Sequence, residues 1–197
     1  MSLAKFITPL ALTLVVAFSA APASAQDTKI FQFGTTNVNL SSGFLGALKS
    51  LSVTPGVIAP TQLNGPQVNF PIIGGAIDLD SALGNIEHSG GLTLTAGKTV
   101  LAIENFTIDT TGKTPVITGL AVLNGALVGR ITLFDLALPK NFSLPIKEYL
   151  GNLVYFTGVT VTLDPGAATT LNKVFGTSTF AGGFTIGSAT VEAFTGR

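Results

Sequence analysis

The sequence predicts a mainly β protein, an antiparallel sandwich or curled sheet with two short helices. Stretches rich in Val, Ile, Leu, Phe and Thr recur along the chain and are separated by glycines, which is the composition of strands and turns. Hydrophobic residues make up 46% of the 197 residues and charged residues only 10%, so much of the chain must be buried in a sheet core. Helical periodicity is confined to two short segments.

Strand positions follow from the alternation of side chains and from the turns between them. The dipeptide Asn124-Gly125 is the strongest hairpin signal, because both residues tolerate the positive φ that a type I′ turn requires. A second turn is predicted at Ala96-Gly97-Lys98. The predicted strands are residues 92–94, 100–108, 116–123, 126–133, 153–163 and 185–194.

The two helices are predicted in segments that resemble each other, VNLSSGFLGALKSL (38–51) and VTLDPGAATTLNKV (161–174). Both read as strand, cap and helix, with two aliphatic residues spaced i, i+3 on one helical face. Ser41 or Ser42 is the expected N-cap of the first helix, and Asp164 before Pro165 that of the second. Either the two segments form an internal pseudo-repeat, or both are ordinary strand-to-helix corners.

The first 25 residues predict a secretory signal peptide, with Lys5, an apolar run over 6–18 and then Ala23-Ser24-Ala25. That apolar run is too short to cross a bilayer as a helix. We therefore expect residues 26–197 to form a single exported domain, periplasmic or extracellular, without a membrane span.

Composition and missing motifs exclude several function classes. Residues 26–197 hold nine basic and ten acidic residues without a basic cluster, which argues against a nucleic-acid partner. The chain has no cysteine, so cysteine-based zinc, iron–sulfur and thiolate haem sites are excluded. No Gly-x-Ser-x-Gly, phosphate-loop or dinucleotide-binding pattern occurs. We expect a protein that is not an enzyme.

Few residues are candidates for a polar site. Asp78 and Asp80 would share one face of a strand, but they lack the dense run of oxygen ligands of a calcium loop. His88 is the only histidine, and its imidazole could ligate a metal or could simply pair with neighbours such as Glu87. One histidine without a second ligand cannot form a zinc site, so the metal remains unassigned.

The middle of the chain resembles the HtaA domain family, which consists of secreted or surface β-rich bacterial domains. The resemblance lies in FPIIGGAIDLDSALGNIEHSGGL (70–92) with the following Asn105-Phe106-Thr107-Ile108, and in VTLDPGA (161–167) with Phe175 and the final glycine-led strand. It covers about two thirds of residues 26–197.

The resemblance implies haem capture by a tyrosine on the N-terminal helix, supported by a histidine. His88 stands where the histidine is expected, but the helix segment 42–48 reads SGFLGAL and has no tyrosine. Tyr149 and Tyr155 are the only phenols in the chain, so they join His88 as candidate ligand-binding residues, with haem as a candidate cofactor.

Two further function classes do not depend on haem. Fourteen phenylalanines against two tyrosines and no tryptophan suggest a pocket for a hydrophobic small molecule. The proline-punctuated stretch 134–145 would form either a lid over such a pocket or plain packing on the core. The alternative class is a structural or adhesive cell-envelope protein without a small ligand.

Overall fold

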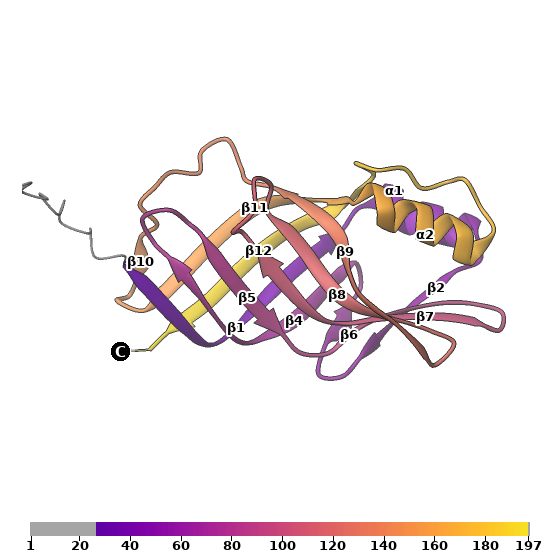
Figure 1. The fold of residues 1–197 in the computed structure, drawn as a ribbon, viewed down its shortest axis with the longest axis horizontal. Coiled ribbons are helices and arrows are strands. Elements are labelled where there is room, and N and C mark those ends of the chain that lie inside the picture. The colour runs from indigo at the N-terminus through magenta and orange to yellow at the C-terminus, as the bar shows by residue number, and fades with distance from the viewer. Residues whose placement is uncertain (1–26, 197) are drawn as a thin grey trace, which may run out of the picture.

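The computed structural model describes residues 27–196, so the predicted signal peptide lies outside the described residues. Twelve strands and two helices make up this part of the chain (Figure 1). The first half contains β1 (Thr28–Leu40), α1 (Ser42–Ser50), β2 (Thr54–Ile58), β3 (Gln62–Asn64), β4 (Gln67–Asp78), β5 (Gly84–His88) and β6 (Gly91–Ala96). The second half contains β7 (Thr99–Asp109), β8 (Val116–Leu123), β9 (Ala126–Ala137), β10 (Glu148–Tyr149), β11 (Leu153–Leu163), α2 (Pro165–Phe175) and β12 (Thr185–Thr195).

Eight of the strands close into an antiparallel barrel. Their order is β7-β5-β4-β1-β12-β11-β9-β8, and β8 pairs back onto β7 to complete the ring. The prediction of a mainly β, antiparallel protein with two short helices is confirmed. Of its two alternatives the sandwich is wrong, because a single sheet curls until it closes on itself. Barrels and sandwiches share the same two-residue alternation, so the pattern could not separate them.

Tight coiling of the sheet depends on places where backbones come unusually close. Gly75 in β4 has φ +113°, and a Cβ atom there would lie 2.4 Å from the carbonyl oxygen of Asn85 in β5. Only glycine fits such an approach. The pairing of β4 with β5 also shifts register between Ile72 and Gly74, and such irregularities bend a strand and increase its twist.

Local predictions are confirmed at the hairpin and at the helix caps. Asn124 and Gly125 have φ values of +50° and +83° between β8 and β9. The hydroxyl of Ser41 accepts a hydrogen bond from the Phe44 backbone N–H at 3.0 Å. The carboxylate of Asp164 accepts from the N–H groups of Gly166 and Ala167 at 2.7 and 3.0 Å. Each cap satisfies N–H groups that the helix itself leaves free.

The sheet extends beyond the barrel at the end where the helices lie (Figure 1). β11 pairs with β9 only over Phe134–Ala137, so the first two thirds of β9 pair with β8 alone. The β6–β7 and β8–β9 hairpins therefore project past the barrel, and β2 adds to the edge of β6. α1 and α2 lie opposite this projecting sheet, with a space between the two layers that shapes the candidate site.

Candidate functional site

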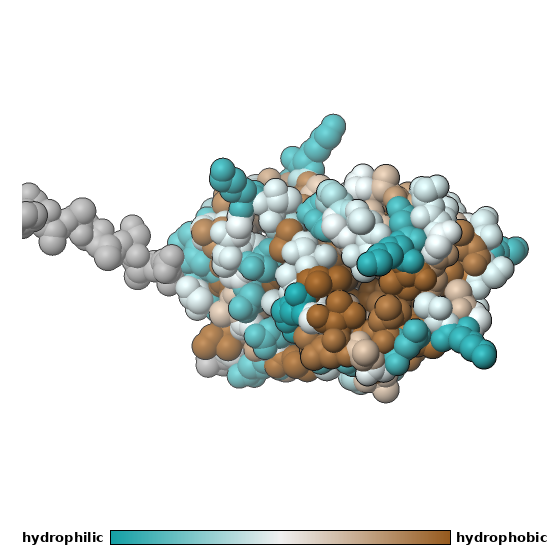
Figure 2. All heavy atoms as spheres, turned by 45° about the vertical axis from the view of Figure 1, so that its right-hand side comes forward, coloured by the Kyte–Doolittle hydropathy of each residue, from teal (hydrophilic) through white to brown (hydrophobic). Residues whose placement is uncertain are grey.

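A groove of about 650 Å³ lies between the two helices and the projecting sheet. We call it the helix–sheet groove. Figure 2 shows hydrophobic side chains gathered in a hollow on this face, with hydrophilic side chains at its edges. Its volume lies within the range of small-molecule sites. The helices contribute Phe44, Ala167, Thr169, Thr170, Leu171, Lys173 and Val174, and the sheet side includes Leu92, Leu94, Leu101, Ile103, Leu123, Val128, Ile131 and Phe134.

The apolar face of α2 forms one wall of the groove. Ala167, Leu171 and Val174 follow the i, i+4, i+7 spacing of a helical stripe, and all three line the cavity. The sequence identifies Leu171 and Val174 as sharing a face, but it does not reveal that this face borders a cavity. One signal in the sequence could have suggested this cavity. The β6–β7 and β8–β9 hairpins, which face α2, carry more apolar residues than the barrel interior can bury, because these hairpins project beyond the barrel.

His88 lies below the groove, inside the barrel, beside a small apolar cavity of about 40 Å³. This inner cavity shares five lining residues with the groove, so it continues the groove into the barrel: Leu40, Val68, Leu92, Phe134 and Ile186. The histidine is only 3% exposed, at the end of β5. His88 does not line the groove itself, so it could reach a groove ligand only through the inner cavity.

Both ring nitrogens of His88 are occupied by hydrogen bonds. Nδ1 lies 3.2 Å from the carbonyl oxygen of Phe106, which can only accept, so Nδ1 carries the proton. Nε2 lies 2.7 Å from the Thr36 hydroxyl and accepts its proton in the neutral ring. Desolvation by burial lowers the pKa of His88 to about 4, so the ring is neutral at pH 7. A neutral imidazole with both nitrogens bonded has no free lone pair for a metal.

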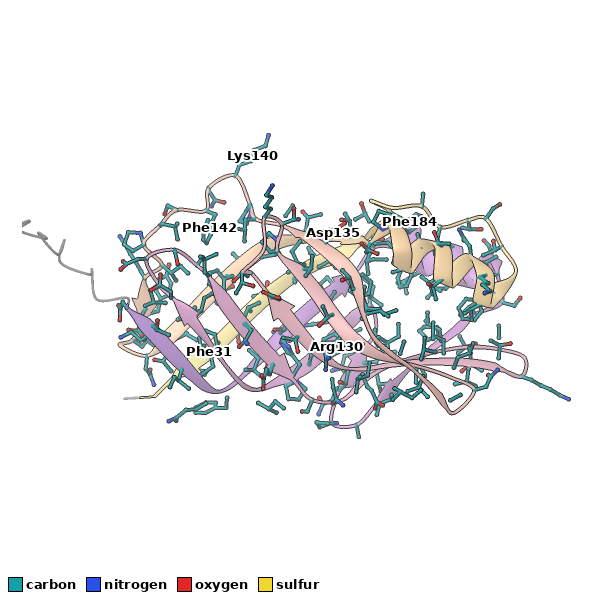
Figure 3. The ribbon with its side chains drawn as sticks, viewed as in Figure 1. Phe31, Arg130, Asp135, Lys140, Phe142 and Phe184 are labelled. Atoms are coloured by element: carbon teal, nitrogen blue, oxygen red, sulfur yellow. The ribbon has the colours of Figure 1, made fainter. Side chains whose placement is uncertain are left out.

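A second cavity, of about 340 Å³, lies toward the other end of the barrel. Thr36 borders both this cavity and the inner cavity beside His88, so the Thr36–His88 pair stands between the two ends of the barrel interior. Leu138, Phe142 and Leu144 of the proline-punctuated segment line it. Figure 3 shows Phe142 on this loop, while Lys140 points away from the barrel. The proline-punctuated segment therefore covers this cavity of about 340 Å³ and not the helix–sheet groove.

The two tyrosines lie together, and neither lines the cavity beside His88. Tyr149 in β10 and Tyr155 near the start of β11 form an edge-to-face pair with ring centroids 6.4 Å apart. They are 55% and 40% exposed. β10 lies at the opposite end of the barrel from α1 and α2 (Figure 1), and neither phenol lines the helix–sheet groove.

Asp78 is the last residue of β4, but Asp80 lies in the turn that follows, so the prediction that the two carboxylates share one face of a strand is wrong. Asp78 is buried, and its Oδ1 accepts from the backbone N–H and the hydroxyl of Ser81. Asp80 is exposed two residues later. Among residues 27–196 no group of three or more His, Cys, Asp or Glu side chains is placed to hold a metal ion.

The fold is similar to that of solved HtaA and HtaB structures from Corynebacterium glutamicum. The C-terminal domain of HtaA matches with a TM-score of 0.65 and 15% identity, over 85% of this chain and 99% of that domain. The N-terminal domain of HtaA matches with a TM-score of 0.62 and 11% identity over 85% and 99%. The haem-binding protein HtaB matches with a TM-score of 0.57 and 12% identity over 87% and 98%. No protein-family model and no curated protein matches the sequence.

The groove does not supply an iron ligand for haem. Protein-bound haem iron is held by the side chain of His, Tyr, Cys or Met. None of the described side chains that line the groove is of these four types, and the helix position nearest the cavity on α1 is Phe44. His88 beneath it is fully hydrogen-bonded. The chain therefore has the fold of HtaA domains, as its sequence predicts, with a groove whose described lining holds no His, Tyr, Cys or Met.

Proposed function

We propose that this protein is an exported, single-domain binding protein that holds a hydrophobic small molecule in the helix–sheet groove. The observation that carries the proposal is the groove itself, about 650 Å³ of space lined mainly by aliphatic and aromatic side chains. Apolar surface left open to water is unfavourable in proportion to its area, so a ligand that covers this lining is stabilised by the hydrophobic effect.

The fold supports the same class of function. HtaB, which shares it, is described as a haem-binding protein, and haem is itself a large, flat, mostly apolar molecule. In this chain haem would have to enter the groove without an iron bond from its lining. A hydrophobic ligand bound by shape and apolar contact fits the residues present.

Export rests on the predicted signal peptide and on the fold shared with HtaA and HtaB. Neither helix of the described residues has the length and apolar character of a membrane span. Intact-mass analysis of the protein secreted from cells is expected to show a chain that begins at or within two residues of Gln26. A mass that includes Met1 would refute export by cleavage.

Binding can be measured with a neutral hydrophobic dye such as Nile red, whose fluorescence rises in apolar surroundings. The informative variant is Thr169→Trp, because Thr169 is exposed on α2 and lines the groove, so a large ring there would occupy the cavity. Its matched control is Ser50→Trp on α1, which does not line the groove. Both hydroxyls bond to the carbonyl four residues earlier, at 3.0 and 2.9 Å, so both variants lose the same local contact.

We expect the wild-type protein and Ser50→Trp to bind the dye equally and Thr169→Trp to bind it several-fold more weakly. Dye binding that is absent from the wild type, or unchanged by Thr169→Trp, would contradict the proposed site. Haem titration beside the dye tests the ligand identity. A sharp Soret band that survives Tyr149→Phe, Tyr155→Phe and His88→Ala together would show haem held without any of these side chains.

A further inference from the structure

The helix–sheet groove has an uneven distribution of charge. Lys173 is the only charged residue among its lining side chains, and the other polar lining residues are Thr99, Asn124, Thr169 and Thr170. No carboxylate borders the cavity among the described residues. The groove therefore presents an apolar surface with one cation.

Lys173 has no acidic partner within the described part of the chain. The two ion pairs found between residues 27 and 196 both use Lys29, which lies 3.2 Å from Asp27 and 3.3 Å from Glu148. The sequence of α2, PGAATTLNKVF, contains no acidic residue that could pair with Lys173 across a helical turn. Its ammonium group is thus available to a ligand.

The neighbouring polar groups leave Lys173 as the main site for a negative charge. The hydroxyls of Thr169 and Thr170 donate to the carbonyls of Pro165 and Gly166, each at 3.0 Å. The side-chain oxygen of Asn124 accepts from the backbone N–H of Val100 at 2.8 Å. These two hydroxyl protons and this amide oxygen are engaged in local bonds, whereas Lys173 carries a full charge beside apolar surface, where an ion pair is stronger than in bulk water.

We propose that the groove binds an amphiphile with one anionic head, of the long-chain carboxylate class, whose chain covers the apolar lining while its head pairs with Lys173. The inference rests on the proposed function and adds the chemistry of the ligand's head group. A single cation matches a single carboxylate. A ligand with two acidic groups would leave one of them without a cationic partner in the lining.

The test compares two molecules with the same chain and different heads, palmitate and hexadecanol, as competitors of Nile red. Lys173→Gln removes the cation, and Lys49→Gln is its matched control. Both lysines are exposed in the last turn of a helix, so both variants lose the same favourable interaction with the helix dipole. Only Lys173 lines the groove.

Palmitate is expected to displace the dye at a concentration roughly fivefold lower than hexadecanol does. This difference is the gain in affinity that one partly exposed ion pair contributes. This preference should persist in Lys49→Gln, vanish in Lys173→Gln and shrink at high salt. If both molecules displace the dye equally from the wild type, or if Lys173→Gln keeps the preference, the anionic head is refuted while the apolar groove stands. If the dye binds but neither molecule displaces it, this inference fails while the apolar groove stands. If the dye does not bind at all, the proposed function and this inference both fail.

Discussion

Acidification should destabilise this protein through His88, and the effect can be isolated because the chain has no other histidine. The ring is 3% exposed and neutral, with Nδ1 bonded to the Phe106 carbonyl and Nε2 to the Thr36 hydroxyl. Protonation would place a proton on Nε2, break the bond donated by Thr36 and bring a charge into an apolar interior. Burial accordingly lowers the pKa of His88 from 6.5 to about 4.

The magnitude follows from proton linkage. Because the folded pKa lies below the unfolded one, the unfolded chain binds more protons between pH 6.5 and pH 4. Stability therefore falls as the pH falls through this window, and the full loss is reached below the folded pKa. One group shifted this far loses about 2 kcal/mol of unfolding free energy between pH 7 and pH 4.5.

Urea unfolding followed by circular dichroism at a series of pH values gives this quantity directly. His88→Gln serves as the titration-silent control, so the carboxylates contribute equally to both proteins and cancel in the difference. The wild type should lose about 2 kcal/mol more than the variant between pH 7 and pH 4.5. The imidazole resonance in an NMR titration provides a check that does not depend on the variant folding. Equal losses in the two proteins, or an imidazole that titrates near pH 6.5, would refute the buried neutral ring.

Three further predictions concern single positions. Replacing Gly125 with valine should lower the unfolding free energy by about 1–2 kcal/mol, because its φ of +83° strains a β-branched residue and a new Cβ meets no atom within 4 Å; an unchanged urea midpoint would count against this. Asp164→Ala should cost about 1 kcal/mol through the loss of the α2 cap, measured by thermal unfolding against Asp164→Asn, which keeps most of the capping energy. Tyr149→Phe and Tyr155→Phe should leave Nile red binding unchanged, since both lie away from the groove; a weakened titration with either would place the ligand elsewhere.

Local features of the fold could be predicted from the sequence because short-range chemistry determines them. The turn between β8 and β9 needs two residues that accept positive φ, which Asn124 and Gly125 do. The start of α2 needs an N-cap followed by a residue with helical φ, which Asp164 and Pro165 provide. β11 spans Leu153–Leu163, the predicted range, although its register with β12 shifts between Phe156 and Val159. β9 is longer than predicted and reaches Ala137, since pairing with β11 holds its last residues in the sheet.

Long-range pairing could not be predicted in the same way. Closure of the barrel depends on β8 meeting β7 on the side opposite to β5, and the alternation of side chains is the same whether the sheet closes or stacks. The helix–sheet groove is even less local, because α1, the β6–β9 hairpins and α2 each supply one part of its wall. His88 was identified as a candidate from its rarity, but its burial and its two hydrogen bonds follow from β1 and β7, which are distant in sequence.

The central claim is that the helix–sheet groove binds a hydrophobic molecule, and mapping a bound ligand on the protein tests it most directly. Two-dimensional amide NMR spectra would be recorded while a neutral apolar ligand, decanol, is titrated to saturation. We expect the largest shifts in α2 and in the hairpins β6–β7 and β8–β9, with smaller shifts near Tyr149 and Tyr155. Shifts that concentrate instead in the loop 138–147, or spectra that do not change at saturation, would contradict the account.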